Sequence, residues 1–346
     1  MRPLLMDMTR DELGALLEGL PKYRLDQLYS FVIQGSEYND MTSLPKSLLS
    51  TLSEEYDATG VSILEVRTAP DGTEKYLFTL RDGNIIEGVL MTYKYGRTIC
   101  VSTQVGCRMN CAFCASGIDG RVRDLTAGEI LGQITEVNRR HGGGVKDKRF
   151  ITNVVLMGSG EPLDNYDNVV KFLGLVRDGI GISLRNISLS TSGLVPNIYR
   201  LADEIGGVTL TISLHAPLDE IRDKIMPVNK AYPILDLIKA TKYYAQKTGR
   251  RVIFEYVMLK GVNDTRECAI ALAGLLKGLP AHVNLINLNY VEEKKLLPCS
   301  KKQTYEFMAL LEKLGVSVTV RRSLGSEVAG ACGQLRRSVL RGETDE

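Results

Sequence analysis

The sequence predicts an α/β protein, an incomplete (βα)6 barrel that follows a small N-terminal α+β region. From about residue 98 onward, six short β-branched runs alternate with six segments of helical periodicity. Regular alternation of this kind indicates parallel strands joined by crossover helices. Eight such units close a barrel of about 250 residues, so six units in about 200 residues indicate a barrel that stays open.

The N-terminal region is predicted to form helices first and strands afterwards. Apolar residues recur at three- and four-residue spacing up to about residue 55, a pattern typical of helices. Residues 61–102 favour strands, and the runs 75–80 and 85–91 flank Asp82-Gly83, a typical hairpin turn. We therefore expect an accessory domain over residues 1–95 and a barrel domain over residues 96–346.

The barrel elements follow in regular order. The expected strands are 98–102, 153–157, 186–190, 208–214, 251–259 and 283–290. The expected helices are 126–141, 166–179, 194–205, 233–249, 265–279 and 302–315. Thr126 and Glu129 have the spacing of a capping box, which marks the start of the first helix. Residues 316–320 could add a last strand.

The unusual motifs of the chain all follow the ends of these expected strands. In barrels of parallel strands, the chemistry lies where the strands end at their C-terminal side. The motifs are GCRMNCAFC (106–114), GSGEP (158–162), STSG (190–193), SLHAP (213–217) and NLNY (287–290), with a glycine-rich segment after residue 321. We therefore expect one functional site on a single rim of the barrel.

Composition restricts the class of protein and its compartment. The chain has 346 residues, 43 basic and 41 acidic, and 44% are hydrophobic, which is typical of a globular protein. No apolar run reaches 18 residues, and charged residues from Asp7 onward interrupt the first segment, so we expect neither a membrane span nor a signal peptide. Seven cysteines cannot all pair with one another. We expect a cytoplasmic protein whose closely spaced thiols serve a metal or catalysis.

Cys107, Cys111 and Cys114 form a C-x3-C-x2-C pattern on one short loop. Three thiolates can hold a cubane iron–sulfur cluster and leave one iron without a protein ligand. An open metal position of this kind can chelate a small molecule. A zinc site completed by a distant Cys or His, or simply buried thiols, would also explain the pattern.

These motifs resemble a known superfamily. The three cysteines, with Phe113 before the last of them, and the GSGEP segment resemble the radical S-adenosylmethionine (SAM) superfamily. The order VSTQVGCRMNCAFC, MGSGEPLDNYDNV, LSTSGLVP, TISLHAPLDEIRDKIMPVN, YVMLKGVND, VNLINLN and GACGQL, over about residues 75–335, resembles the RlmN/Cfr family of RNA adenine methyltransferases. Ser159 departs from that family's pattern, which often has Met there.

The resemblance implies two bound cofactors. A [4Fe-4S] cluster would be held by Cys107, Cys111 and Cys114. SAM would be bound by residues on the same rim of the barrel: Gly160, Glu161, Ser192, Ser213, Leu214, His215 and Asn289.

The resemblance also implies three catalytic residues. Adenine C2 and C8 are electrophilic carbons, so direct methyl transfer from SAM fails. In the family, one SAM methylates a cysteine, here Cys332, and a second SAM yields the radical that activates this methyl group. Cys100 would resolve the protein–RNA adduct by forming a disulfide with Cys332, and Glu87 would accept the ring proton. Cys268 and Cys299 have no expected role.

The activity that the resemblance implies is methylation of adenine C2 in 23S rRNA, in the peptidyl-transferase region, and in tRNA. The alternatives are C8 methylation of the same rRNA adenine, a non-catalytic iron–sulfur RNA-binding factor, or a redox- or zinc-regulated RNA binder. The expected partners are 23S rRNA, tRNA and an electron donor such as flavodoxin or ferredoxin, with no membrane, and the protein is expected to be a monomer. The N-terminal domain would support RNA binding. Phosphate contacts are expected from arginines that flank the site motifs: Arg121, Arg123, Arg321, Arg322 and Arg336.

Overall fold

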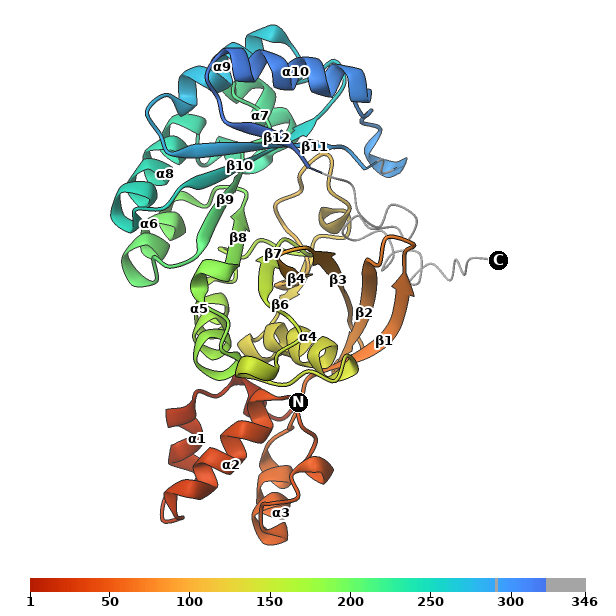
Figure 1. Cartoon of the computed structure of the whole chain (residues 1–346), viewed down its shortest axis with the longest axis vertical. Coiled ribbons are helices and arrows are strands. Elements are labelled where there is room, and N and C mark those ends of the chain that lie inside the picture. The colour runs from red at the N-terminus through yellow and green to blue at the C-terminus, as the bar shows by residue number, and fades with distance from the viewer. Residues whose placement is uncertain (290–291, 322–346) are drawn as a thin grey trace.

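The computed structural model describes residues 1–289 and 292–321 (Figure 1). Three helices open the chain: α1 (Arg10–Leu16), α2 (Lys22–Ile33) and α3 (Lys46–Glu55). The strands that follow are β1 (Val61–Thr68), β2 (Glu74–Leu80), β3 (Ile85–Tyr93), β4 (Gly96–Cys100), β5 (Gln104–Gly106), β6 (Arg121–Asp124), β7 (Asn153–Leu156), β8 (Ile187–Thr191), β9 (Thr209–Ser213), β10 (Val252–Met258), β11 (Ala281–Asn287) and β12 (Val318–Val320).

The remaining helices alternate with the strands of the barrel. They are α4 (Ala127–Arg140), α5 (Tyr166–Leu175), α6 (Val195–Glu204), α7 (Asp219–Ile225), α8 (Ile234–Thr248), α9 (Arg266–Leu276) and α10 (Lys301–Lys313). Helices α4 to α10 cover the outer side of the curved sheet, and α1 to α3 lie beyond α4 at one end of the molecule (Figure 1).

Within the described residues, ten strands form one sheet in the order β1-β2-β3-β4-β7-β8-β9-β10-β11-β12. The pairs among β1 to β4 are antiparallel, and every pair from β4 to β12 is parallel. Strands β4, β7, β8, β9, β10 and β11 each lead into helices, and the short strand β12 adds a seventh parallel member. The fold is therefore the expected open (βα)6 barrel with an N-terminal α+β region.

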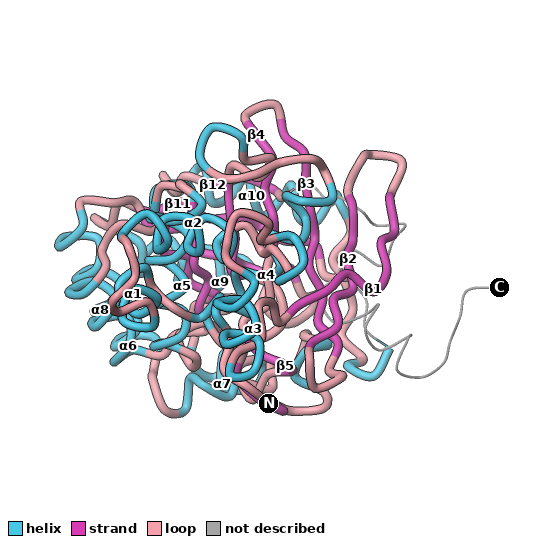
Figure 2. The backbone as a smooth tube through the Cα atoms, turned by 90° about the horizontal axis from the view of Figure 1, so that it is seen from below, coloured by secondary structure: helices cyan, strands magenta, loops and turns pink. Residues whose placement is uncertain are grey.

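The N-terminal strands continue the sheet of the barrel. β3 and β4 pair antiparallel from Val89 opposite Cys100 to Tyr93 opposite Gly96, so the sheet runs through residue 95 without a break. Strands β1 to β4 stand on one side of the molecule when it is seen from below (Figure 2). A division into two domains at residue 95 stays a prediction.

The local signals in the sequence account for several boundaries. Thr126 Oγ1 accepts a hydrogen bond from the Glu129 backbone N–H at 3.2 Å, and the Glu129 carboxylate accepts one from the Thr126 N–H, which confirms the capping box. The Asp82-Gly83 turn joins β2 to β3 as predicted, with the Asn84 N–H donating to Asp82 Oδ1.

Some elements are absent from the sequence prediction. The expected helix 166–179 ends as α5 at Leu175 and continues as a π-helical turn over Val176–Ile180. The short pair β5–β6 and helix α7 were not anticipated. The three residues of β5 and the four of β6 are too few for a recognisable periodicity of hydrophobic residues, and the seven residues of α7 make only about two helical turns.

One continuous core joins the N-terminal region to the barrel. Leu28 of α2, Leu131 of α4 and Ile212 of β9 belong to the same cluster of buried side chains. Asp7 Oδ1 also accepts a hydrogen bond from the Gly128 N–H at the start of α4. None of the helices within residues 1–289 and 292–321 combines the length and apolar character needed to cross a bilayer.

Candidate functional site

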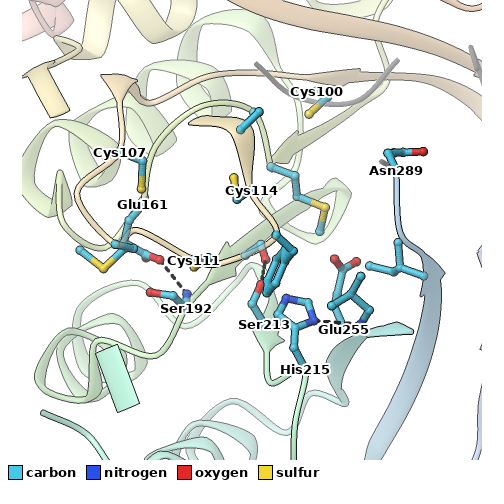
Figure 3. Close-up of a pocket in the computed structure, with 18 of the residues that line it drawn as sticks. Cys100, Cys107, Cys111, Cys114, Glu161, Ser192, Ser213, His215, Glu255 and Asn289 are labelled. Atoms are coloured by element: carbon cyan, nitrogen blue, oxygen red, sulfur yellow. Dashed lines mark hydrogen bonds between the residues drawn. The ribbon is translucent and has the colours of Figure 1, made fainter. Parts of the chain in front are cut away.

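A cavity of about 410 Å³ opens inside the barrel at the C-terminal ends of its strands (Figure 3). Its size lies within the usual range of small-molecule sites, about 300–1,000 Å³. Its walls bring together most of the residues that sequence analysis selected. These are Cys100, Cys107, Cys111, Cys114, Gly160, Glu161, Ser192, Ser213, His215 and Asn289. Leu214 and Glu87 do not line it.

The loop with three cysteines is closed at its base by the small sheet β5–β6. Val105 pairs with Arg123, and the Cys107 N–H donates to the Gly120 carbonyl at 2.9 Å. At the far end of the loop, the Ala112 N–H donates to the Ile225 carbonyl of α7 at 2.8 Å. The loop is thus fixed at both ends, and its three thiols face one cavity.

Burial determines the electrostatics of these thiols. Loss of water raises the pKa of Cys107 to about 12 and raises that of Cys111 well above its usual range, and each neighbouring thiolate opposes ionisation further. No disulfide joins any two of the six cysteines in the described ranges. A bound iron would supply the positive charge that stabilises the thiolates.

The donor set fits an iron–sulfur cluster better than a single ion. Within the described residues, no three Cys, His, Asp or Glu side chains are spaced to bind one metal ion together. In a cubane cluster each thiolate binds a different iron, so the ligands need not converge on one point. Cys107, Cys111 and Cys114 would hold such a cluster.

The glycine-rich turn after β7 packs too closely against the chain that leads into the cysteine loop to admit a side chain. Gly160 has φ +109°, and a Cβ there would lie 2.7 Å from the Cβ of Gln104. A Cβ at Gly158 would lie 2.7 Å from Ser102 Oγ. The Glu161 N–H donates to Gln104 Oε1 at 2.9 Å, which fixes the turn against the start of the cysteine loop. Glycine is therefore required at both positions.

Ser159, the departure from the family pattern, faces away from the cavity. It is buried, and its N–H donates to Ser102 Oγ at 2.9 Å. Its hydroxyl lies 3.2 Å from Ser116 Oγ, just after the cysteine loop. The serine thus joins the turn to the loop by a hydrogen bond and leaves Gly160 and Glu161 on the cavity wall.

Glu161 and Ser192 form a polar wall. The Glu161 carboxylate accepts the Leu163 N–H at 3.0 Å and the Ser192 N–H at 2.6 Å. Burial raises the pKa of Glu161, and the backbone N–H of Ser192 opposes this shift. Ser192 Oγ is buried and has no hydrogen-bond partner within the described chain. A buried hydroxyl without a partner on a cavity wall is suited to a polar ligand.

Ser213 and His215 continue this wall at the end of β9. Ser213 Oγ lies 3.3 Å from Ser190 Oγ. His215 has the strained φ of +58°, and its N–H donates to the Glu255 carbonyl while its own carbonyl accepts from Asn263 Nδ2 at 2.7 Å. Leu214 is buried between them, and its carbonyl accepts from Arg222 Nε.

The His215 ring is neutral. Burial, assisted by the charge of Arg222, lowers its pKa to about 3. Nδ1 accepts the Val257 N–H at 3.0 Å, so the neutral ring carries its hydrogen on Nε2. Phe113 of the cysteine loop packs edge-on against the ring, with centroids 4.7 Å apart. The histidine can therefore donate a hydrogen bond but brings no charge to the cavity.

Arg222 is a structural residue that sequence reasoning missed. It is fully buried, and its guanidinium donates to the Ser192, Ser213 and Leu214 carbonyls at 2.6–3.2 Å. These carbonyls belong to the ends of two neighbouring strands, so one side chain fixes both. Arg222 lies in the SLHAPLDEIRD segment that was recognised in the sequence. Its burial could not be predicted, because no local pattern distinguishes a buried arginine from a solvated one.

The opposite wall is built from β3, β4 and the segment after β11. Cys100 lies opposite Val89 in the sheet, and the two pack with Met91 in a small buried cluster. Figure 3 shows Cys100 and Asn289 on the other side of the cavity from Glu161 and Ser192. Apart from Asn289 and the hydroxyl of Tyr93, which donates to Met91 Sδ at 3.4 Å, the part of this wall that comes from β3 and β4 presents apolar side chains and one thiol.

Glu87 lies on the same face of β3 as Val89, two residues away, but behind the cavity wall. Its carboxylate is buried and lies 3.1 Å from the ammonium of the buried Lys75 on β2. Because Lys75 pairs with Val89, it shares this face of the sheet. Glu87 was selected from the sequence as the expected proton acceptor, whereas its ion-pair partner Lys75 was not.

Glu255 of β10 is a second buried carboxylate that sequence analysis did not select. It lines the cavity, and Arg321 Nη1 lies 3.3 Å from its Oε1. Burial raises the pKa of Glu255, and the charge of Arg321 opposes the shift. The signal in the sequence that could have revealed Glu255 was an acidic residue inside a strand-like run of β-branched residues.

Two of the arginines expected to contact RNA phosphates are paired with carboxylates of the protein itself. Arg121 pairs with Asp124 and Asp164, and Arg123 is held by Asp82 and Glu129, so internal carboxylates engage both arginines. Cys332, Arg322 and Arg336 lie outside the described residues.

Comparison with known proteins identifies the class. The family model of the radical SAM superfamily matches residues 101–272, which span the cysteine loop, the glycine turn and the strands of the polar wall. A solved structure, a radical SAM methyltransferase from Sphaerobacter thermophilus, superposes with a TM-score of 0.90 and 42% identity, covering 96% of this chain and 98% of that one.

Curated relatives narrow the class to one family. A probable dual-specificity RNA methyltransferase RlmN from Thermoanaerobacter pseudethanolicus is 48% identical over 97% of this chain and 98% of its own length. One of the same name from Geobacillus kaustophilus is 45% identical over 99% of this chain and 94% of its own length. The chain belongs to the RlmN family of radical SAM RNA methyltransferases.

Proposed function

We propose that this radical SAM RNA methyltransferase adds a methyl group to C2 of adenine in the peptidyl-transferase region of 23S rRNA and in tRNA. The observation that carries the proposal is a single cavity with two unlike walls. Three cysteines and a hydrogen-bonded polar wall lie on one side, and Cys100 lies on the other.

The polar wall is the proposed SAM site. Gly160 and the Glu161 carboxylate suit the amino group of the methionine part, and Ser192 Oγ is a hydroxyl without a partner in the described chain. Ser213, the backbone around Leu214 and the Nε2 hydrogen of His215 provide further donors and acceptors on this wall, and the amide of Asn289 provides them from across the cavity. Cys107, Cys111 and Cys114 would hold the cluster, which would supply the electron for reductive cleavage of SAM.

The thiols carry the methyl group in this proposal. Cys332 accepts a methyl group from one SAM. The 5′-deoxyadenosyl group of the second SAM takes one hydrogen atom from this methyl group, and the resulting carbon radical bonds to C2 of the adenine. The adduct then loses one electron, for which the oxidised cluster would be the acceptor, and Glu87 accepts the proton from C2. The Cys100 thiolate attacks the Cys332 sulfur, so an S–S bond forms as the carbon–sulfur bond breaks. The electron pair of that bond stays on the methylene carbon, which takes up a proton and leaves as the methyl group of the RNA.

The proposed cellular setting follows from this chemistry. The proposed chemistry needs Cys100 and Cys332 as thiols at the start of each turnover, which requires a reducing compartment, so we place the enzyme in the cytoplasm. Flavodoxin or ferredoxin would reduce the cluster, and the enzyme would act as a monomer. Residues 1–95 would act as an accessory domain that supports RNA binding.

The test is anaerobic reconstitution with iron, sulfide and SAM, followed by reaction with 23S rRNA and tRNA transcripts and nucleoside analysis by mass spectrometry. We expect 2-methyladenosine from the wild type and none from Cys332→Ala. Methylation at C8 alone would identify the Cfr-like activity. Unchanged methylation by Cys332→Ala would refute the methyl-carrier role, and no methylation at all would favour a non-catalytic RNA-binding factor.

A further inference from the structure

A second, smaller hollow adjoins the cavity at the other end of the barrel. Its volume is about 170 Å³, and it shares Met91, Tyr93 and Arg321 with the larger cavity. Its remaining walls come from the starts of three neighbouring strands, at Thr98, Asn153, Val154, Val155, Asn186 and Ser188, together with Tyr95 and Arg185. A ligand here would therefore reach the edge of the proposed catalytic site.

A pair of stacked tyrosines forms one side of this hollow. The rings of Tyr93 and Tyr95 lie 5.0 Å apart and within 5° of parallel. Tyr93 is half-buried, whereas Tyr95 is 73% exposed and has one ring face available. An exposed tyrosine already stacked on a partner is an aromatic platform with little freedom left to lose on binding.

The turn that carries the platform is fastened to the barrel. Gly96 has φ +144°, and a Cβ there would lie 2.2 Å from Thr152 Oγ1, so only glycine fits. The Arg97 N–H donates to the same Thr152 hydroxyl at 2.9 Å. The tip of the β3–β4 hairpin is therefore held against the start of β7, and the two tyrosines are positioned in advance.

Arg185 supplies the positive charge of the hollow. Arg321 also lines it but pairs with Glu255 at 3.3 Å, no lining residue in the described chain is Asp or Glu, and Lys94 is exposed on the adjoining hairpin tip. Arg185 is exposed and forms no ion pair with any described residue. A guanidinium beside an exposed aromatic ring is the combination by which proteins bind single-stranded nucleic acids, the base on the ring and the phosphate on the cation.

We propose that this hollow binds a nucleotide of the RNA strand next to the target adenine, with its base stacked on Tyr95 and its phosphate paired with Arg185. This inference rests on the proposed function. An adenine inside folded RNA must leave its stack to reach Cys100 and the polar wall. Its neighbour in the strand then lies next to the cavity, and the hollow adjoins the cavity through their shared residues Met91, Tyr93 and Arg321.

The experiment measures the affinity of the reconstituted holoenzyme for a fluorescent transcript of the peptidyl-transferase region of 23S rRNA, by anisotropy at several salt concentrations. Tyr95→Ala should weaken RNA binding about tenfold, the usual scale for loss of one base–aromatic stack, whereas Tyr95→Phe should stay within about twofold of wild type. Arg185→Ala should weaken binding and reduce the salt slope by about 0.7, the value for one single-strand phosphate contact.

Matched controls lie on other surfaces. Tyr305→Ala removes an exposed tyrosine on α10, and Arg177→Ala removes an exposed arginine beside α5, and both should bind RNA as the wild type does. The affinity for SAM should be unchanged in every variant.

Three results would overturn the inference. RNA affinity of Tyr95→Ala and Arg185→Ala equal to that of the controls would exclude the hollow as an RNA site, while methylation by the wild type would keep the proposed function intact. Loss of SAM affinity in these variants with RNA affinity retained would assign the hollow to SAM. A wild type that neither binds nor methylates RNA would refute both proposals.

Discussion

The two walls of the cavity differ in how their polar groups are held. On the wall made by residues 158–161, 190–193 and 213–215, nearly every polar group has a fixed partner, and three carbonyls converge on the buried guanidinium of Arg222. On the wall made by β3 and β4, Val89, Met91, Tyr93 and Cys100 face the cavity, and the charged pair of Lys75 and Glu87 lies behind them.

The difference indicates a division of labour. A wall of fixed donors and acceptors pays its ordering entropy during folding and can then hold a polar ligand in one orientation. A strand face with apolar side chains and one thiol excludes water and offers a nucleophile. We infer that the first wall binds and the second wall reacts.

The largest effect is expected from a substitution in the cysteine loop, which lies between the two walls. Cys111→Ala should abolish cluster assembly and methylation, because two thiolates remain where three are needed. Iron content and visible absorbance after anaerobic reconstitution measure the first effect, and nucleoside analysis measures the second. The matched control is Cys268→Ala, a buried cysteine on α9, which should keep its full iron content. Normal cluster content in Cys111→Ala would remove this residue from the ligand set.

The charged pair behind the reacting wall gives the next largest effect. Lys75→Met should lower the free energy of unfolding by about 3–5 kcal/mol, because it leaves the Glu87 carboxylate buried without this cation. The double variant Lys75→Met/Glu87→Leu should recover most of that stability, because an apolar pair can replace a buried ion pair. Urea unfolding measures both variants.

Methylation activity separates the role of Glu87 as a general base from its contribution to stability. Glu87→Gln should reduce methylation at least about 100-fold, the usual scale for losing a general base, and the double variant should stay inactive although stable. A double variant that methylates RNA normally would contradict the assignment of Glu87 to the reacting wall.

Arg222→Met should destabilise the binding wall. Three buried carbonyls would lose their donor, at about 1 kcal/mol or more each, so we expect the free energy of unfolding to fall by about 3 kcal/mol. Arg200→Met, which removes an exposed arginine from a surface ion pair, should change it by less than about 1 kcal/mol. Equal stability of the two variants would show that the carbonyls do not depend on Arg222.

The neutral His215 predicts a pH dependence. The unfolded histidine takes up a proton near pH 6.5, whereas the folded one stays neutral down to about pH 3. Below pH 6.5 the unfolded chain therefore binds more protons, and this histidine lowers stability as the pH falls. Between pH 7 and pH 5 the wild type should lose about 2 kcal/mol more than His215→Asn, which tolerates the same positive φ. Parallel pH profiles would contradict a buried neutral ring.

Sequence alone predicted the barrel, the rim and most of the cavity wall, because strand alternation and the end of each strand are local signals. Ten residues selected from the sequence, from Cys100 to Asn289, line the walls of one cavity. It missed Arg222, Lys75 and Glu255 because burial of a charged side chain depends on contacts between distant segments. It also missed the β5–β6 pair, whose strands are too short to show a period. The position of Glu87 behind the wall depends on sheet register, which residue spacing within one strand does not determine.

The most direct test of the division between walls is the SAM affinity of the anaerobically reconstituted holoenzyme, measured by equilibrium dialysis for Ser192→Ala and Cys100→Ala. Ser192→Ala should weaken SAM binding about 3- to 10-fold, the effect of one lost hydrogen bond, while Cys100→Ala should bind SAM as the wild type does yet release no methylated RNA. Weaker SAM binding in Cys100→Ala together with unchanged binding in Ser192→Ala would contradict the assignment of binding to one wall and reaction to the other.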